Sequence, residues 1–234
     1  MPVKGGIEMQ HDIFNWERIM NFFSRIYYFL GINFLFIICN LPVLLFLLFV
    51  GISRAGTFLP LFLLCLLPAA PAFSAVLYSM GRFVSGIEAG AVRDYRKGYE
   101  KYFKKAVKSG ALQLTAIFMI WTNLNFFTRI VPVFLLAVLF MLLFLVVLLL
   151  TPNLYFLTVN TELTSPDVCK LALAYTLGKP VAAIGNLAAF GIILLAFELS
   201  PGTTVLFMGS FYGFLVAFMN RRIISEMKEK YGKA

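Results

Sequence analysis

The sequence predicts an all-α membrane protein of about six transmembrane helices, with interfacial amphipathic helices on the cytoplasmic side. Three observations predict this class. Hydrophobic residues make up 61% of the 234 residues and charged residues only 13%, whereas soluble domains carry about 25% charged residues. The charges are also segregated, which leaves long apolar runs between them. Finally, residues 135–150 contain no polar side chain, which excludes the alternating pattern of a transmembrane β-barrel.

Six runs without a charged residue define the predicted spans. Each run has at least 18 residues, and a helix needs about 20 apolar residues to cross a hydrocarbon core about 30 Å thick. The runs are 26–53, 55–81, 109–128, 130–161, 180–197 and 199–220. The predicted division is an N-terminal cytoplasmic interfacial helix over residues 1–25, a six-helix transmembrane bundle over 26–220, and a basic cytoplasmic tail over 221–234.

The N-terminal segment does not have the pattern of a cleaved signal peptide. It carries Asp12, Glu17 and Arg18 and lacks an apolar stretch ahead of a small-residue cleavage site, so we expect it to be retained. Asp12 is a suitable N-cap for an amphipathic helix that leads into the first span.

The basic residues predict the orientation. Lys and Arg counts in the seven segments outside the runs are 3, 1, 8, 1, 2, 0 and 5. Placing the odd segments inside puts 18 of the 20 basic residues in the cytoplasm, as the positive-inside rule requires. We therefore expect a multi-pass membrane protein with both termini cytoplasmic. The net charge of +9 then reflects topology, and no nucleic-acid partner is expected.

The long loop between the second and third runs predicts an amphipathic helix. An aromatic stripe is flanked by basic residues, which suits a helix lying on the inner leaflet. The candidate interface residues are Tyr95, Lys97, Tyr99, Lys101, Tyr102, Phe103 and Lys104. Two interpretations are open: anchoring to the lipid bilayer, or docking a protein partner.

A second cytoplasmic helix is predicted to start with Ser165 as its cap and Pro166 in the first position. Gly178 and Pro180 are expected to end it and to start the fifth span.

Two features inside the runs suggest special helix geometry. Pro68 and Pro71 remove backbone donors and predict a kink or helix break, interpreted either as the wall of a cavity or hinge or as a kink packed against a neighbour. Gly209 and Gly213 place small residues on one face of the last span and predict close helix packing. That packing is either internal or between two copies, so the oligomeric state stays open.

The polar residues noted inside the spans are neutral: Asn33, Asn40, Gln113, Asn123, Asn125 and Asn186. Proton coupling usually requires a carboxylate within the membrane, which argues against a proton-driven carrier. Neither a catalytic motif nor a Cys/His ligand pattern is present, so no enzyme, cofactor or metal site is predicted.

Two stretches resemble the YesL-type family of bacterial multispan membrane proteins, which is defined largely by a domain of unknown function. The first contains Pro71-Ala72, Arg93-Asp94-Tyr95 and Tyr102-Phe103-Lys104-Lys105. The second runs from Pro152 through Asn160, Leu171-Ala172-Leu173 and Lys179-Pro180 to Arg221-Arg222-Ile223-Ile224. The resemblance spans roughly residues 15–225. It implies association with carbohydrate uptake, in particular with ABC importers, and implies no catalytic residues.

Three function classes follow. The leading hypothesis is a non-catalytic accessory or assembly subunit that contacts the permease subunits of a carbohydrate ABC importer. The alternative is a self-sufficient small-solute transporter or channel. The third class is a lipid-handling enzyme.

Overall fold

A computed structural model describes residues 16–131 and 133–221. The predicted Asp12 cap and most of the predicted basic tail lie outside these ranges. The described chain is helical, in the following order: α1 (Trp16–Cys39), α2 (Leu41–Phe49), the 3₁₀ turn η1 (Ile52–Arg54), α3 (Leu59–Leu66), α4 (Ala69–Val84), α5 (Ala91–Asn125), the π-helical turn η2 (Phe126–Ile130), α6 (Phe134–Asn160), α7 (Ser165–Gly178), α8 (Pro180–Leu199) and α9 (Pro201–Met219).

In these ranges, five segments are long and apolar enough to cross a membrane. They are Arg18–Cys39, Leu59–Val84, Phe134–Asn160, Pro180–Leu199 and Pro201–Met219. Large apolar side chains are exposed along them, for example Phe134, Leu135 and Met141 on α6. A surface of this kind is stable in lipid and not in water. The chain is therefore a multi-pass helical membrane protein.

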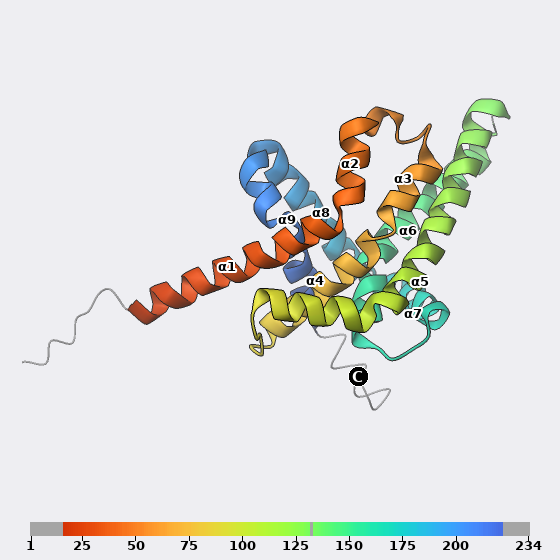
Figure 1. Ribbon diagram of the computed structural model, residues 1–234. Helices are drawn as coiled ribbons and strands as arrows, with labels where there is room; N and C mark the ends of the chain where they lie inside the picture. The colour runs from red at the N-terminus through yellow and green to blue at the C-terminus, as the bar shows by residue number, and fades with distance from the viewer. Residues whose placement is uncertain (1–15, 132, 222–234) are drawn as a thin grey trace, which may run out of the picture.

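Helix α4 is the centre of the bundle. It packs against α1, α5, α6 and α9, and its side chains Ala72, Val76 and Met80 are fully buried. The main core is therefore built around α4 (Figure 1).

The first predicted run, 26–53, is not one helix. Helix α1 passes without interruption through the predicted boundary at residue 25 and ends at Cys39, and α2 begins at Leu41. Pro42 occupies the first turn of α2, where its missing N–H costs least. The Asn40 side chain donates to the carbonyl of Phe36, 2.8 Å away. The sequence prediction missed this break.

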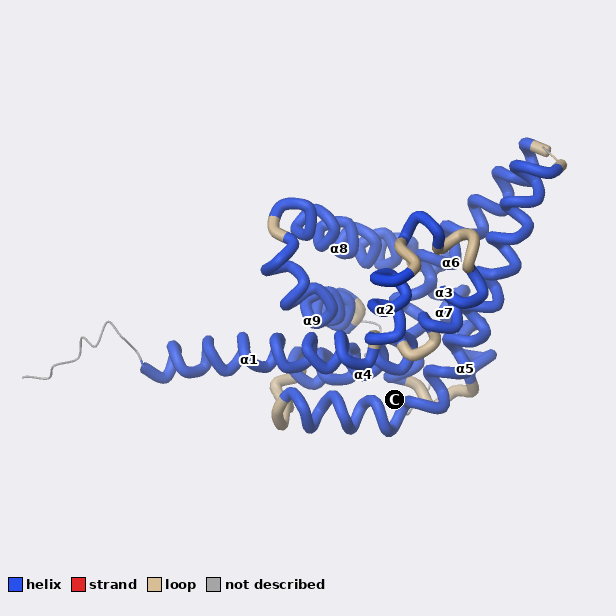
Figure 2. The backbone as a smooth tube through the Cα atoms, turned by 45° about the horizontal axis from the view of Figure 1, so that its top comes forward, coloured by secondary structure: helices blue, strands red, loops and turns tan. Residues whose placement is uncertain are grey.

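Helix α5 combines the predicted basic helix and the third apolar run in 35 residues. Its first part runs along the base of the molecule in Figure 1, and its later part turns toward the top, as Figure 2 also shows. Ser109 and Gly110, both fully or largely buried, lie between the basic part and the apolar part. The predicted interfacial helix and the predicted third span are thus parts of one helix, which changes direction along its length.

The start of α7 differs by one residue from the prediction. Thr164 is the N-cap and Ser165 is the first helical residue. The Thr164 hydroxyl hydrogen-bonds the carboxylate of Asp167 in the first turn of α7, whereas the Ser165 hydroxyl donates to the carbonyl of Lys105 on α5. Gly178 ends α7 and Pro180 begins α8, as predicted.

Candidate functional site

The basic part of α5 has one face inside the protein and one face outside. Tyr95 and Tyr102 are buried, with 3% and 7% of their surface exposed. Lys97, Lys101 and Lys104 are exposed. The helix is therefore fixed by its aromatic side while its lysines are free to meet a partner or a lipid headgroup.

The predicted interface set is thereby divided. Tyr95 and Tyr102 contact the chain itself, so they hold α5 in place and do not form an outer surface. Phe103 is 42% exposed, and Tyr99 is partly buried between Tyr95 and Phe103, with ring centroids 6.3 Å and 5.4 Å away. The amphipathic pattern identified the helix, but part of its apolar stripe faces protein rather than lipid.

The close approach of α4 and α5 depends on Gly98. A Cβ at this position would lie 2.7 Å from Cδ1 of Tyr78. The Tyr78 ring then packs against Tyr102, with centroids 5.8 Å apart. This contact fixes how closely the basic part of α5 lies against α4.

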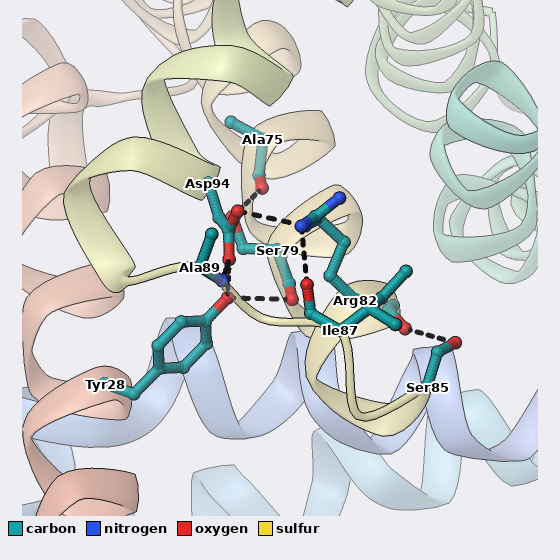
Figure 3. A network of polar contacts seen from close by, with 9 residues as sticks. Tyr28, Ala75, Ser79, Arg82, Ser85, Ile87, Ala89 and Asp94 are labelled. Carbon is teal, nitrogen blue, oxygen red and sulfur yellow. Dashed lines mark hydrogen bonds and ion pairs between the residues drawn. The ribbon is translucent and has the colours of Figure 1, made fainter.

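A polar network fixes the first turn of α5 to α4 and α1 (Figure 3). Asp94 is 1% exposed, and its Oδ1 lies 2.9 Å from Nε of Arg82 in an ion pair. The Tyr28 hydroxyl lies 3.0 Å from both Asp94 Oδ2 and the carbonyl of Ser79, and its single O–H can donate to either acceptor. A buried carboxylate needs such partners, because an unpaired charge would be costly.

The same network holds the loop between α4 and α5. The Ala89 N–H donates to Asp94 Oδ2 over 2.9 Å, and the Arg82 guanidinium donates to the carbonyl of Ile87. Gly86 and Gly90 have φ of 67° and 121°, values that residues with a side chain rarely adopt. Asp94 was not among the site residues predicted from the sequence, since the residue type alone does not show that a carboxylate is buried beside an arginine.

Two lysines of α5 have altered acidity. Burial lowers the pKa of Lys105, whose ammonium donates to the carbonyl of Thr161. Contact with Tyr102 raises the pKa of Lys101, whose Nζ lies 4.9 Å from the ring centroid. Lys105 therefore joins α5 to the end of α6, while Lys101 stays charged at the surface.

A partly open cavity of about 590 Å³ is lined by residues of α1, α3, α4, α5, α6, α8 and α9. Apolar side chains dominate its wall, including Phe62, Phe73, Trp121, Phe144 and Met208. Its size falls in the range of about 300–1,000 Å³ that ligand pockets occupy.

Beside Tyr212, the wall contains three neutral polar side chains that are joined by hydrogen bonds. The Tyr155 hydroxyl donates to Gln113 Oε1 over 2.8 Å, and Gln113 Nε2 donates to the Thr151 hydroxyl over 2.6 Å. Tyr155 and Gln113 are 7% and 8% exposed. Gln113, Thr151 and Tyr155 therefore form a fixed polar group in a mostly apolar wall.

The predicted break at Pro68 and Pro71 borders this cavity. Helix α3 ends at Leu66 and α4 begins at Ala69, so Pro68 stands between the helices and Pro71 lies in the first turn of α4. Leu66, Ala69 and Ala70 line the cavity, whereas neither proline does.

Gly209 and Gly213 lie at close helix contacts. A Cβ at Gly213 would be 2.4 Å from Cγ1 of Val76, and one at Gly209 would be 2.6 Å from Cδ1 of Phe36. Asn33 uses this space: its Nδ2 donates to the Val205 carbonyl over 2.7 Å, and its Oδ1 accepts from the Gly209 N–H over 2.9 Å. In a regular α-helix the Gly209 N–H would pair with the Val205 carbonyl. The Asn33 amide bonds the same two backbone groups and so joins α1 to the backbone of α9.

A chain of buried amides connects four helices. Asn220 Nδ2 donates to Asn186 Oδ1 over 3.2 Å, and Asn186 Nδ2 donates to Asn153 Oδ1 over 2.9 Å. Asn153 in turn donates to the Thr176 hydroxyl over 3.1 Å. The sequence singled out Asn186 but not its partners, since a lone amide in an apolar run does not reveal which helix it faces.

The described residues contain no group of three His, Cys, Asp or Glu side chains suited to a metal ion. Comparison with protein-family models, curated proteins and solved structures finds no match to this chain. The features of the structure that bear on function are the basic face of α5, the buried network of Tyr28, Arg82 and Asp94, and the cavity.

Proposed function

We propose that the chain is a non-catalytic accessory or assembly subunit of a carbohydrate ABC importer in the bacterial cytoplasmic membrane. The observation that supports this role is the basic face of α5, whose lysines are exposed while the opposite side of the helix is buried. A surface that is already ordered loses little conformational entropy on binding. The choice of an ABC importer as the partner rests on the resemblance to the YesL-type family.

The proposal includes six crossings with both termini in the cytoplasm, where the later part of α5 is the third crossing. The arrangement of the connections supports it. Those near residues 54, 129 and 200 lie at the top of Figure 1, and the 85–90 loop and α7 lie at its base. The connections at the base also carry most of the loop lysines and arginines.

In this orientation the first part of α5 lies at the inner membrane surface. Lys97, Lys101 and Lys104 then face either anionic headgroups or an acidic surface of the permease. Each basic group close to an anionic leaflet contributes about 1 kcal/mol. The contacts of Asp94 with Tyr28 and Arg82 fix the first turn of α5 to α1 and α4, and thereby hold the basic face in position.

The cavity favours the alternative, a self-sufficient transporter or channel for a small solute. Its wall, however, is mostly apolar, and its few polar side chains include Gln113, Thr151, Tyr155 and Tyr212. A sugar would lose many hydrogen bonds to water there and regain few, at several kcal/mol for each unpaired group. This imbalance is the reason to prefer the accessory role for carbohydrate uptake.

Affinity purification from native membranes in mild detergent tests the proposal. The wild-type chain should recover ABC permease subunits, and a Lys97→Gln/Lys101→Gln/Lys104→Gln variant should recover far less. The matched control is Arg18→Gln/Arg25→Gln/Lys170→Gln, which removes three exposed charges elsewhere. Equal recovery by the two variants, or no permease with the wild type, contradicts the proposal.

A further inference from the structure

The cavity has the properties of a lipid site rather than a water-filled space. It lies among segments that can span a membrane, since α3, α4, α6, α8 and α9 all contribute to its wall. Cavities with mostly apolar walls accept apolar molecules, and this one is partly open to its surroundings. The molecules available to it in a bilayer are lipid chains.

The polar group in the wall has unused hydrogen-bonding capacity. A carboxamide has two N–H donors and two acceptor lone pairs on its oxygen. The contacts of Gln113 with Thr151 and Tyr155 use one of its donors and one of its lone pairs. A hydroxyl or ester group entering the cavity can therefore bond to Gln113 without breaking either contact.

The uncharged wall of the cavity favours lipids with a neutral head group. None of the described residues in the cavity wall is charged. An anionic headgroup or a carboxylate would be desolvated there without a counter-ion, which is strongly unfavourable. A neutral head meets no such penalty.

We propose that this cavity binds a neutral single-chain lipid, with the apolar chain along Phe62, Phe144 and Met208 and a hydroxyl or ester group at Gln113. This site is independent of the basic face of α5, and it assigns a function to the helix break at Pro68. The break separates α3 from α4, and its neighbours Leu66, Ala69 and Ala70 form part of the wall.

Trp121 provides the readout because it lines the cavity and the chain has only one other tryptophan, Trp16. A Trp16→Phe variant is reconstituted in nanodiscs of unbrominated phosphatidylcholine. The probes are a fatty alcohol brominated at mid-chain, the corresponding alkane and the corresponding fatty acid anion. Saturable quenching of Trp121 fluorescence by the alcohol is expected, with binding roughly fivefold tighter than that of the alkane because of one hydrogen bond. The anion should bind most weakly.

Two pairs of variants test the site. Ala69→Phe fills the cavity, and Ala111→Phe adds the same bulk at an exposed position on α5. Only Ala69→Phe should remove saturable quenching. Gln113→Leu should abolish the preference for alcohol over alkane, whereas Thr115→Val, on the exposed side of α5, should keep it.

Three results would overturn the site. The first is quenching that rises without saturation, and the second is quenching that is the same in Ala69→Phe and Ala111→Phe. The third is equal affinity for alcohol and alkane in the parent protein. If Ala69→Phe fails to fold, the comparison of Gln113→Leu with Thr115→Val decides the question by itself.

Discussion

Nε of Arg82 lies 2.9 Å from Oδ1 of Asp94, and this ion pair ties the end of α4 to the first turn of α5. The Asp94 side chain is 1% exposed and that of Arg82 is 23% exposed. Both also contact the loop between the two helices, through Ala89 and Ile87. The pair therefore fixes the position of the first turn of α5, from which the basic face continues.

Asp94→Asn should lower stability by about 2 kcal/mol. The loss is below the ~3–5 kcal/mol of fully buried pairs because Arg82 retains some contact with solvent. Thermal unfolding in detergent measures the change. Glu100→Gln is the control, since its pair with Arg96 is exposed on both sides and should have little influence on melting. Equal melting of the two variants would show that the Arg82–Asp94 pair does not anchor α5.

Gly213→Ala should destabilise the bundle, because the added Cβ would be 2.4 Å from Cγ1 of the fully buried Val76. Overpacking of this kind costs about 1–3 kcal/mol. Gly191→Ala is the control, since a Cβ there meets nothing within 4 Å and should instead favour the helix by up to ~1 kcal/mol. The two melting temperatures should move in opposite directions. A stabilised Gly213→Ala protein would mean that α9 and α4 are not in close contact.

Asn186→Leu should remove two links of the amide chain, leaving Asn153 and Asn220 without their shared partner. Interhelical hydrogen bonds in membranes contribute about 0.6 kcal/mol each on average, so a loss of about 1–2 kcal/mol is expected. Asn123→Leu is the comparison, because its amide bonds only the carbonyl of Met119 on the same helix. A similar effect of both changes would argue against a chain of amides across helices.

Sequence patterns predicted the all-helical class and five of the long apolar helices, because mean hydropathy and charge segregation are properties of a whole run. The third run, 109–128, is the later part of α5 and is not among the five. They were less informative where one residue decides the geometry. Pro42 lies at the start of the second helix in the first run, Asp94 is buried in the first turn of α5, and Asn153 of α6 accepts a hydrogen bond from Asn186 of α8. One of the two interpretations of Pro68 and Pro71 placed them in the wall of a cavity or hinge, but neither proline lines the cavity, whose wall comes from several helices that only the fold brings together.

Reporter fusions test the orientation. Fusions after Leu199 should report an external position, and those after Lys97 and Lys230 an internal one, because 18 of 20 basic residues then lie inside. An external signal at Lys97 would place the basic face of α5 on the wrong side for a permease partner that approaches from the cytoplasm.

Uptake measured in two settings tests the accessory role most directly. Deleting the gene for this chain should lower ATP-dependent uptake of one sugar in cells that keep the permease genes, and wild-type protein should restore it. Liposomes that contain only this protein should not take up the same sugar, since a subunit that acts by binding does not move solute itself. The expected result is therefore reduced uptake in cells and no uptake in liposomes. Robust uptake by liposomes without permease or ATPase would contradict the accessory role and establish a self-sufficient carrier.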